Sequence, residues 1–139
     1  MRTILVAVSS IFLFIAAAGG QTAADLAMRY HHYDVYELKP GVQMTPKFDP
    51  SGLVCEMLVE QAHFVSNGIA FGPRIDERNA FSIIDELVPA SERGAELNSS
   101  EECMGICRTT YQYSNVAISI LPDGDTRLIR IKWRNRSCS

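Results

Sequence analysis

Residues 116–133 read VAISILPDGDTRLIRIKW, and they contain the clearest structural signal in the chain. Apolar side chains occupy every second position on both sides of Asp123-Gly124, which is the pattern of two strands that each bury one face. Asp-Gly favours a β-hairpin because glycine tolerates the positive φ that tight hairpin turns require. In the second strand the apolar positions alternate with Arg130, Lys132 and Arg134. We therefore predict a half-buried hairpin with one basic face.

A second hairpin is expected between Val42 and Glu60. Asp49-Pro50-Ser51-Gly52 places Asp, Pro and Gly where a type I turn prefers them. Pro46 has no amide hydrogen, so the strand 42–48 should lie at a sheet edge or contain a break. A helix over 53–64 is the alternative for the second half, and the well-formed turn favours the strand.

Between the hairpins, apolar residues recur at helical spacing after the N-cap candidate Asp76, and Pro89 ends the pattern. The stretch 90–102 is rich in Ser, Glu and Asn and predicts an exposed loop. The segment 21–39 is ambiguous: residues 23–29 are a candidate short helix, and residues 33–36 a candidate extended stretch after it. The order strand, strand, helix, strand, strand predicts an α+β fold, in which one helix covers an antiparallel sheet built from two β-hairpins (ββαββ).

The first twenty of the 139 residues have the composition of a secretory signal. Arg2 precedes an apolar stretch, and small residues lead to Gly20. A retained membrane anchor is the alternative, but the apolar run is shorter than the ~20 residues that a spanning helix prefers. We expect residues 1–20 to be a signal peptide, residues 21–139 to form a single α+β domain, and the product to be secreted or periplasmic and not membrane-spanning after cleavage.

The composition, with 47% hydrophobic and 21% charged residues, is typical of a globular protein and excludes wholesale disorder. The net charge of −3 argues against nucleic acid as a partner.

The chain contains four cysteines, an even number, so export predicts two disulfides. The cysteines are Cys55, Cys103, Cys107 and Cys138. Pairing Leu121 with Thr126 in the C-terminal hairpin brings Cys138 near Cys107, which favours Cys107–Cys138 and leaves Cys55–Cys103. A Cys103–Cys107 bridge is the least expected, because so short a loop rarely allows the required Cβ geometry. A zinc site is the alternative, but the spacing lacks the paired motif of common zinc knuckles. We predict no metal and no cofactor.

Three groups of residues are catalytic candidates. His32 and Asp34, followed by His63, have the order of a two-histidine, one-carboxylate iron site, although a polar aromatic N-terminal segment explains them equally well. Glu56 with Glu60, and Asp85 with Glu86, are candidate acid and base pairs for glycan hydrolysis. The alternative role of Glu56 and Glu60 is charge pairing across the sheet with the basic strand. The sequence contains no Gly-x-Ser-x-Gly elbow and no phosphate-binding Gly-rich loop, so the catalytic residues remain unassigned.

Charge is distributed unevenly along the mature chain. Residues 21–102 carry six basic and fourteen acidic side chains, whereas residues 103–139 carry six basic and two acidic ones. Arg130, Lys132, Arg134 and Arg136 alternate along the last strand and form a candidate face for an anionic partner, such as an envelope component or an acidic protein. A solvated sheet face, or pairing with the acidic half, is the alternative. Tyr111, Tyr113 and Trp133 could anchor a partner, although their spacing is more typical of core packing.

Three further stretches are distinctive: Gly52-Leu53-Val54-Cys55-Glu56-Met57, Asp85-Glu86-Leu87-Val88-Pro89 with Glu92-Arg93-Gly94, and Ile131-Lys132-Trp133 with Cys138. In these stretches the chain resembles small exported bacterial proteins that carry no assigned function. The resemblance implies export and a bacterial source, and it implies no activity.

The sequence thus favours an exported, non-catalytic binding or envelope-associated module. The alternative is a small secreted hydrolase that acts on cell-wall or polysaccharide substrates with acidic residues.

Overall fold

The structure is a computed structural model, and it describes residues 20–138 apart from 33–34, 63, 67–68 and 72. The predicted signal peptide lies outside the described residues except for Gly20. The helices are α1 (Ala23–Arg29), α2 (Glu77–Leu87) and α3 (Ala90–Arg93). The strands are β1 (His31–His32), β2 (Tyr36–Lys39), β3 (Val42–Phe48), β4 (Val54–Gln61), β5 (Phe64–Ser66), β6 (Ile69–Phe71), β7 (Glu96–Cys103), β8 (Cys107–Tyr113), β9 (Val116–Asp123) and β10 (Thr126–Trp133).

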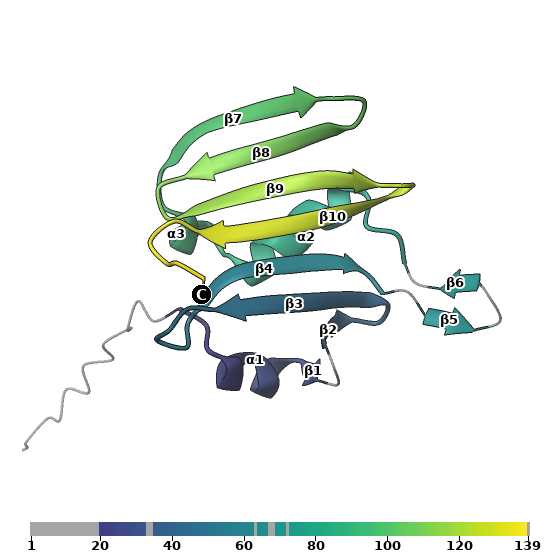
Figure 1. Cartoon of the computed structure of the whole chain (residues 1–139), viewed down its shortest axis with the longest axis horizontal. Helices are drawn as coiled ribbons and strands as arrows, with labels where there is room; N and C mark the ends of the chain where they lie inside the picture. Colours follow the sequence, from purple (N-terminus) through teal and green to yellow (C-terminus); the bar gives the residue numbers. More distant parts are fainter. Residues whose placement is uncertain (1–19, 33–34, 63, 67–68, 72, 139) are drawn as a thin grey trace, which may run out of the picture.

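Most of the described chain forms one antiparallel sheet of eight strands in the order β1-β2-β3-β4-β10-β9-β8-β7 (Figure 1). The C-terminal hairpin lies at its centre, because β10 pairs with β9 on one side and with β4 on the other. Strands β5 and β6 form a separate hairpin. Within the described residues the longest helix, α2, has eleven residues, and no helix is long and apolar enough to cross a membrane.

This architecture overturns the predicted ββαββ fold with one covering helix. The stretch 90–102, predicted to be a loop, contains α3 and most of β7, and β2 adds a further strand beside β3. Strand β7 was missed because all eight of its residues are exposed, so that it has no apolar alternation to reveal it. Hydrogen bonding to β8, rather than burial, holds it in the sheet.

The two predicted hairpins and the central helix are confirmed as elements. Helix α2 begins after Asp76, whose side chain accepts a hydrogen bond from the Asn79 amide at 2.7 Å. Asp49 Oδ1 accepts from the amides of Ser51 and Leu53 and thereby orders the turn into β4. The Ser51 hydroxyl also donates to this carboxylate, and its hydrogen bond is the main reason that the pKa of Asp49 lies below its usual value. The two amide hydrogen bonds lower this pKa further.

Pro46 lies where the sequence predicted, at a local edge and beside a break. Strand β2 covers β3 only as far as Met44, so the outer edge of β3 is unpaired at Pro46. The register between β3 and β4 then shifts after Lys47.

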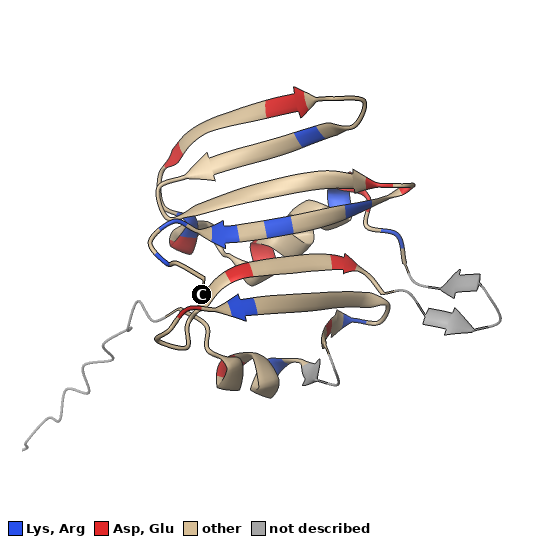
Figure 2. Ribbon diagram, in the orientation of Figure 1, with Lys and Arg blue, Asp and Glu red and all other residues tan. Residues whose placement is uncertain are grey.

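Burial of one sheet face forms the core. The buried strand residues include Met44, Met57, Ile118 and Ile131, and they pack in one cluster with Leu26 of α1 and with the apolar side of α2. The contributing residues of α2 are Ala80, Ile83, Ile84 and Leu87. Helix α2 lies behind β4, β9 and β10 in Figure 1, so the opposite face of the sheet faces the viewer. We call this opposite surface the open face. Figure 2 marks the positions of the charged residues along the strands.

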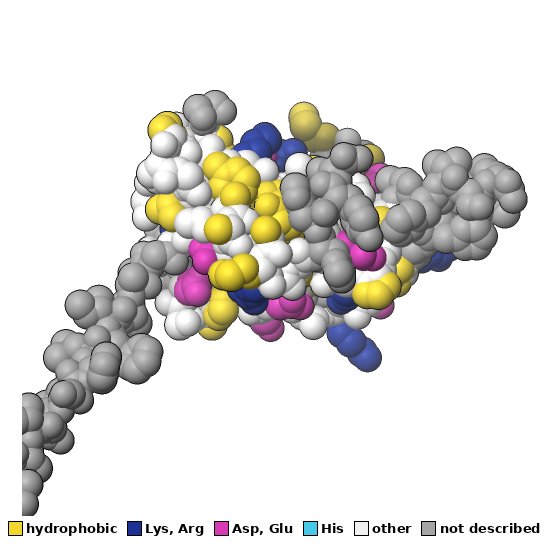
Figure 3. Space-filling view, turned by 90° about the horizontal axis from the view of Figure 1, so that it is seen from below, with side chains coloured by type: hydrophobic (Ala, Val, Ile, Leu, Met, Phe, Trp, Pro, Cys, Tyr) yellow, Lys and Arg dark blue, Asp and Glu magenta, His cyan; other side chains and the backbone are white. Residues whose placement is uncertain are grey.

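Helix α1 lies along the edge of the sheet near β2, where the Tyr36 hydroxyl donates to the carbonyl oxygen of Ala23 at 3.3 Å. Tyr30, which follows α1, donates to Glu86 of α2 at 3.2 Å and so links the two helices. Burial raises the pKa of the Tyr30 hydroxyl. Seen from below, the described surface on this side mixes apolar, acidic and basic side chains (Figure 3).

The two disulfides are Cys55–Cys138 and Cys103–Cys107, so the predicted pairing is wrong although all four cysteines are bridged. The hairpin turn is two residues tighter than expected: Thr126 pairs with Asp123, and Gly124 adopts the positive φ of +61°. Strand β10 ends at Trp133, and the tail that follows crosses to β4 rather than to β8. Gly105, with φ of +82°, allows the tight turn that places Cys103 directly opposite Cys107.

We predict that the two disulfides contribute unequally to stability. Cys55–Cys138 spans 83 positions and Cys103–Cys107 spans 4. If loop entropy of the unfolded chain dominates, removing the long bridge costs about 4–5 kcal/mol and removing the short one about 2 kcal/mol. Guanidinium unfolding of the C55A/C138A and C103A/C107A double variants measures the difference. Equal losses would show that the unfolded-chain account is wrong here.

Candidate functional site

The register of the sheet places a line of polar residues across the open face. Lys132 of β10 is paired with Glu56 of β4 on one side and with Ala117 of β9 on the other. The line continues from Glu56 to Lys47 and from Ala117 to Gln112. Because strands lie about 4.8 Å apart, residues in such a line are neighbours in space. The small side chain of Ala117 leaves room between Lys132 and Gln112.

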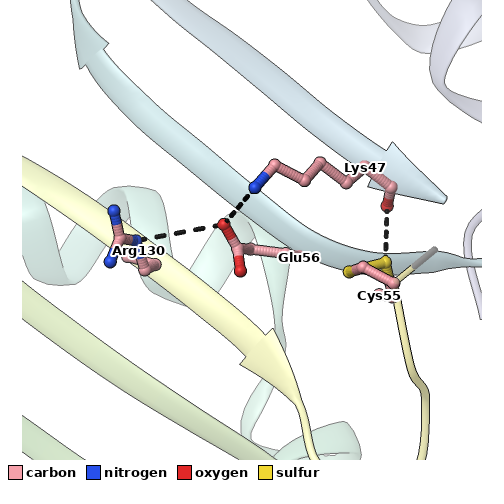
Figure 4. A network of polar contacts seen from close by, with 5 residues as sticks. Lys47, Cys55, Glu56 and Arg130 are labelled. Atoms are coloured by element: carbon pink, nitrogen blue, oxygen red, sulfur yellow. Dashed lines mark hydrogen bonds and ion pairs between the residues drawn. A yellow bond between two sulfur atoms is a disulfide. The ribbon is translucent and has the colours of Figure 1, made fainter.

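Glu56 is the acid at the centre of this face, and two cations approach it from neighbouring strands (Figure 4). Its Oε1 lies 3.0 Å from Lys47 Nζ and 4.0 Å from Arg130 Nε. Glu56 is 17% exposed, whereas the Lys47 and Arg130 side chains are 62% and 50% exposed. This confirms the predicted charge pairing between β4 and the basic strand for Glu56 and Arg130. One carboxylate is therefore shared between two cations, so the local charge remains positive.

Beside this network, Cys55 Sγ lies 3.3 Å from the carbonyl oxygen of Lys47. A disulfide sulfur has no hydrogen to donate, so we treat this approach as a packing contact. The disulfide from Cys55 to Cys138 holds the C-terminal tail next to the ion pairs of Glu56.

The four predicted cations do not form one row. Arg130 and Lys132 are exposed on β10, but Arg134 and Arg136 lie beyond its end. Arg134 donates to Gln112 Oε1 at 3.0 Å, which keeps it over the open face. Arg136 instead stacks on the Trp133 ring, 5.5 Å from its centroid, and donates to the Val54 carbonyl oxygen at 2.5 Å. Arg136 thus binds the tail to the body of the protein, and only three of the four cations share the open face.

A hollow of about 800 Å³ lies where β10 passes into the C-terminal tail. Cations line it (Lys132, Arg134 and Arg136), and Glu56 is the single carboxylate among its described lining residues. The amides of Gln112 and Asn135 add hydrogen-bonding groups. Neither amide was predicted from the sequence. The register of β8 against β9 places Gln112 at the hollow, and no local pattern could have revealed that register.

The aromatic anchor candidates belong to the core. Trp133 is 6% exposed and lies in the buried cluster, and Tyr111 and Tyr113 pack partly buried against it. Burial raises the pKa of the Tyr111 hydroxyl, and the charge of Glu77 adds to this effect. The core-packing alternative is therefore the correct one.

The candidate catalytic carboxylates are not brought together. Glu60 accepts a hydrogen bond from Gln43 at 2.8 Å on the open face, four residues from Glu56 along β4. Asp85 pairs with Arg93, and Glu86 bonds to Tyr30; both are on α2, on the opposite side of the sheet.

The histidine site cannot be placed, because Asp34, His63 and the side chain of His32 lie outside the described residues. Glu101, Cys103 and Cys107 come within 4.8 Å of one another, a spacing that suits a metal. However, both thiols are consumed in the disulfide, which removes the thiolates that zinc would require.

Comparison of the chain with protein-family models, with curated proteins and with solved structures finds no match.

Proposed function

We propose that the chain is an exported, non-catalytic binding module that captures an anionic polymer of the cell envelope through the open face. The observation that carries this proposal is the excess of cations around the hollow. Lys132, Arg134 and Arg136 line it with Glu56 as the single carboxylate among its described lining residues. That carboxylate is already paired with Lys47 and Arg130. Within the described part of the chain, Lys132 has no ion pair, although it is exposed beside the hollow. Exposed cations that lack internal partners are available to a ligand.

Two further features support a polymer as the ligand. The hollow is open and broad, and amide groups lie beside its cations. Cations bind carboxylate, sulfate or phosphate groups, and amides bind the hydroxyls that envelope polysaccharides carry.

The disulfides support export, because such bridges persist in the oxidising conditions outside the cytoplasm. With a signal peptide over residues 1–20, a secreted or periplasmic location follows.

Hydrolysis is the weaker alternative. A glycosidase of the common type needs two carboxylates that face each other across the bound sugar. The hollow offers Glu56, and this carboxylate is already paired with Lys47 and Arg130. Binding requires only the exposed cations, and we therefore favour it.

We predict that the variant R130S/K132S/R134S binds polygalacturonate about tenfold more weakly than the unchanged protein at low salt, because each exposed charge contact contributes modestly. The matched control R29S/R74S/R78S removes the same charge from other surfaces and should keep affinity within about twofold. Titration calorimetry measures both. If the two variants weaken equally, overall charge rather than the open face governs binding. Binding to anionic vesicles but not to polygalacturonate would identify a lipid surface instead.

We also predict that E56Q strengthens polygalacturonate binding about two- to fivefold, because it releases Lys47 and Arg130 from their shared carboxylate. The matched variant E60Q removes the same charge from the same strand, but Glu60 bonds to an amide rather than to a cation. The gain in polygalacturonate affinity should therefore be smaller for E60Q than for E56Q. The free energy of unfolding of E56Q should fall by no more than about 1 kcal/mol. A loss of affinity in a folded E56Q protein would show that Glu56 itself contacts the ligand.

A further inference from the structure

Strand β7 ends the sheet, and no other described strand lies against its outer side. It is the last strand in the sheet order, and its ladder runs only to β8. All eight of its residues are exposed. Among the described elements, no strand or loop pairs with the outward main-chain groups of β7. An edge of this length is a template for pairing with another extended chain.

The other edge of the sheet is protected. Its terminal strand, β1, has two residues and the next strand, β2, has four, and α1 lies beside them. By contrast β7 reads ELNSSEEC, without the proline or lysine that commonly blocks an edge. Its one irregularity is a register shift between Glu96 and Asn98, near its start. The two ends of the described sheet are therefore unlike, and β7 leaves the longer edge accessible.

The charge of β7 determines which chain can pair with it. Glu96, Glu101 and Glu102 give the strand three carboxylates, and Arg108 of β8 neutralises Glu102 in an ion pair. A second copy would bring three more carboxylates to this edge, and an antiparallel pair of β7 strands centred on Ser99 would set Glu96 against Glu102 on both sides. Like charges directly opposite each other destabilise a strand pair, whereas opposite charges stabilise it. A cationic strand is therefore the complementary partner.

A small groove next to this edge has matching chemistry. It holds about 240 Å³ and lies between the start of α2 and β8. The carboxylates of Glu77 and Glu101 line it together with Tyr111, and Arg127 is the one cation among its described lining residues. Ile120 and Pro122 supply an apolar wall. A long basic side chain could place its methylene groups on this wall and its charge near the two carboxylates.

A disulfide also constrains the end of this edge before any partner arrives. Cys103–Cys107 joins the ends of β7 and β8 at the tip of their hairpin. Leu97, Met104 and Ile106 of the same hairpin are 57%, 98% and 65% exposed. A pre-ordered strand loses less conformational entropy on binding, and exposed apolar side chains gain from being covered.

We propose that β7 binds an extended cationic segment of another protein by strand addition, so that the segment becomes a ninth strand of the sheet. Main-chain hydrogen bonds supply the affinity, and the carboxylates of β7 together with Glu77 select basic residues. This surface is separate from the cations of the open face, and it serves a partner of opposite charge.

The test uses a peptide with blocked ends that alternates Lys with Thr or Val over eight residues. Amide hydrogen exchange of the full mature protein should show slower exchange in β7 when the peptide is bound. The same peptide methylated at each interior backbone nitrogen keeps its charge but loses its main-chain donors, and it should bind at least about tenfold more weakly. Equal binding of the methylated peptide, or unchanged exchange in β7, would overturn strand addition.

Charge variants test the selection of basic residues. E96Q/E101Q/E102Q should weaken peptide binding about tenfold at low salt, whereas E37Q/E60Q/E92Q, which removes the same charge elsewhere, should change it by less than about twofold. R130S/K132S/R134S should bind the peptide as well as the unchanged protein does, which separates this inference from the anion-binding face. If both glutamate variants weaken binding equally, the peptide responds to overall charge and the proposal fails.

Discussion

Burial of one face of β4, β9 and β10 under the helices is the constraint on which the rest of the structure depends. Side chains alternate along a strand, so when Ile129 and Ile131 enter the core, Arg130 and Lys132 must face outward. A slip of one residue would bury these cations, at a cost of several kcal/mol for each. The apolar residues thereby fix both the register of the sheet and the position of its basic face.

The long disulfide adds the second element of the candidate site. The tail after β10 has no regular structure of its own, yet it supplies Arg134, Asn135 and Arg136 to the hollow. Cys138 joins this tail to Cys55 on β4, and Arg136 reinforces the link through Trp133 and the Val54 carbonyl. The covalent bond thus determines which groups lie over the open face as well as restricting the unfolded chain.

Local periodicity predicted the elements that bury a long stripe of side chains. It failed for β7, which buries none, and for β2, whose four residues are too few to show a clear alternation. The C-terminal hairpin and α2 bury a stripe of residues each, so their patterns were visible in the sequence. Strand β7 buries none, and its Ser, Asn and Glu residues suggested a loop. The register error in the hairpin came from treating Pro122 and Asp123 as turn residues, whereas both lie in β9.

The disulfide pairing and the composition of the hollow depend on which strands are neighbours. Cys138 reaches β4 because β4 occupies the second edge of β10. Nothing in residues 116–138 indicates that neighbour, since strand order is decided by the whole core. The basic face was predictable because it depends on one strand, and Glu56 was predictable only as one of several possible charge partners. The place of Gln112 at the hollow was not predictable, because it depends on two successive strand pairings, from β10 to β9 and from β9 to β8.

The uneven distribution of charge along the sequence becomes a separation of charge in the folded sheet, with cations on β10 and carboxylates on β7. Strands β9 and β8 lie between β10 and β7, which puts the basic strand about 14 Å from the acidic edge at the usual strand spacing. The screening length at physiological ionic strength is about 8 Å, so the carboxylates of β7 neutralise the cations of β10 only weakly. Glu56 does form ion pairs on the open face, with Lys47 and Arg130, but its single negative charge is smaller than the summed charge of the cations there. A chain with a small net charge therefore presents two surfaces of opposite sign that are largely unpaired with each other.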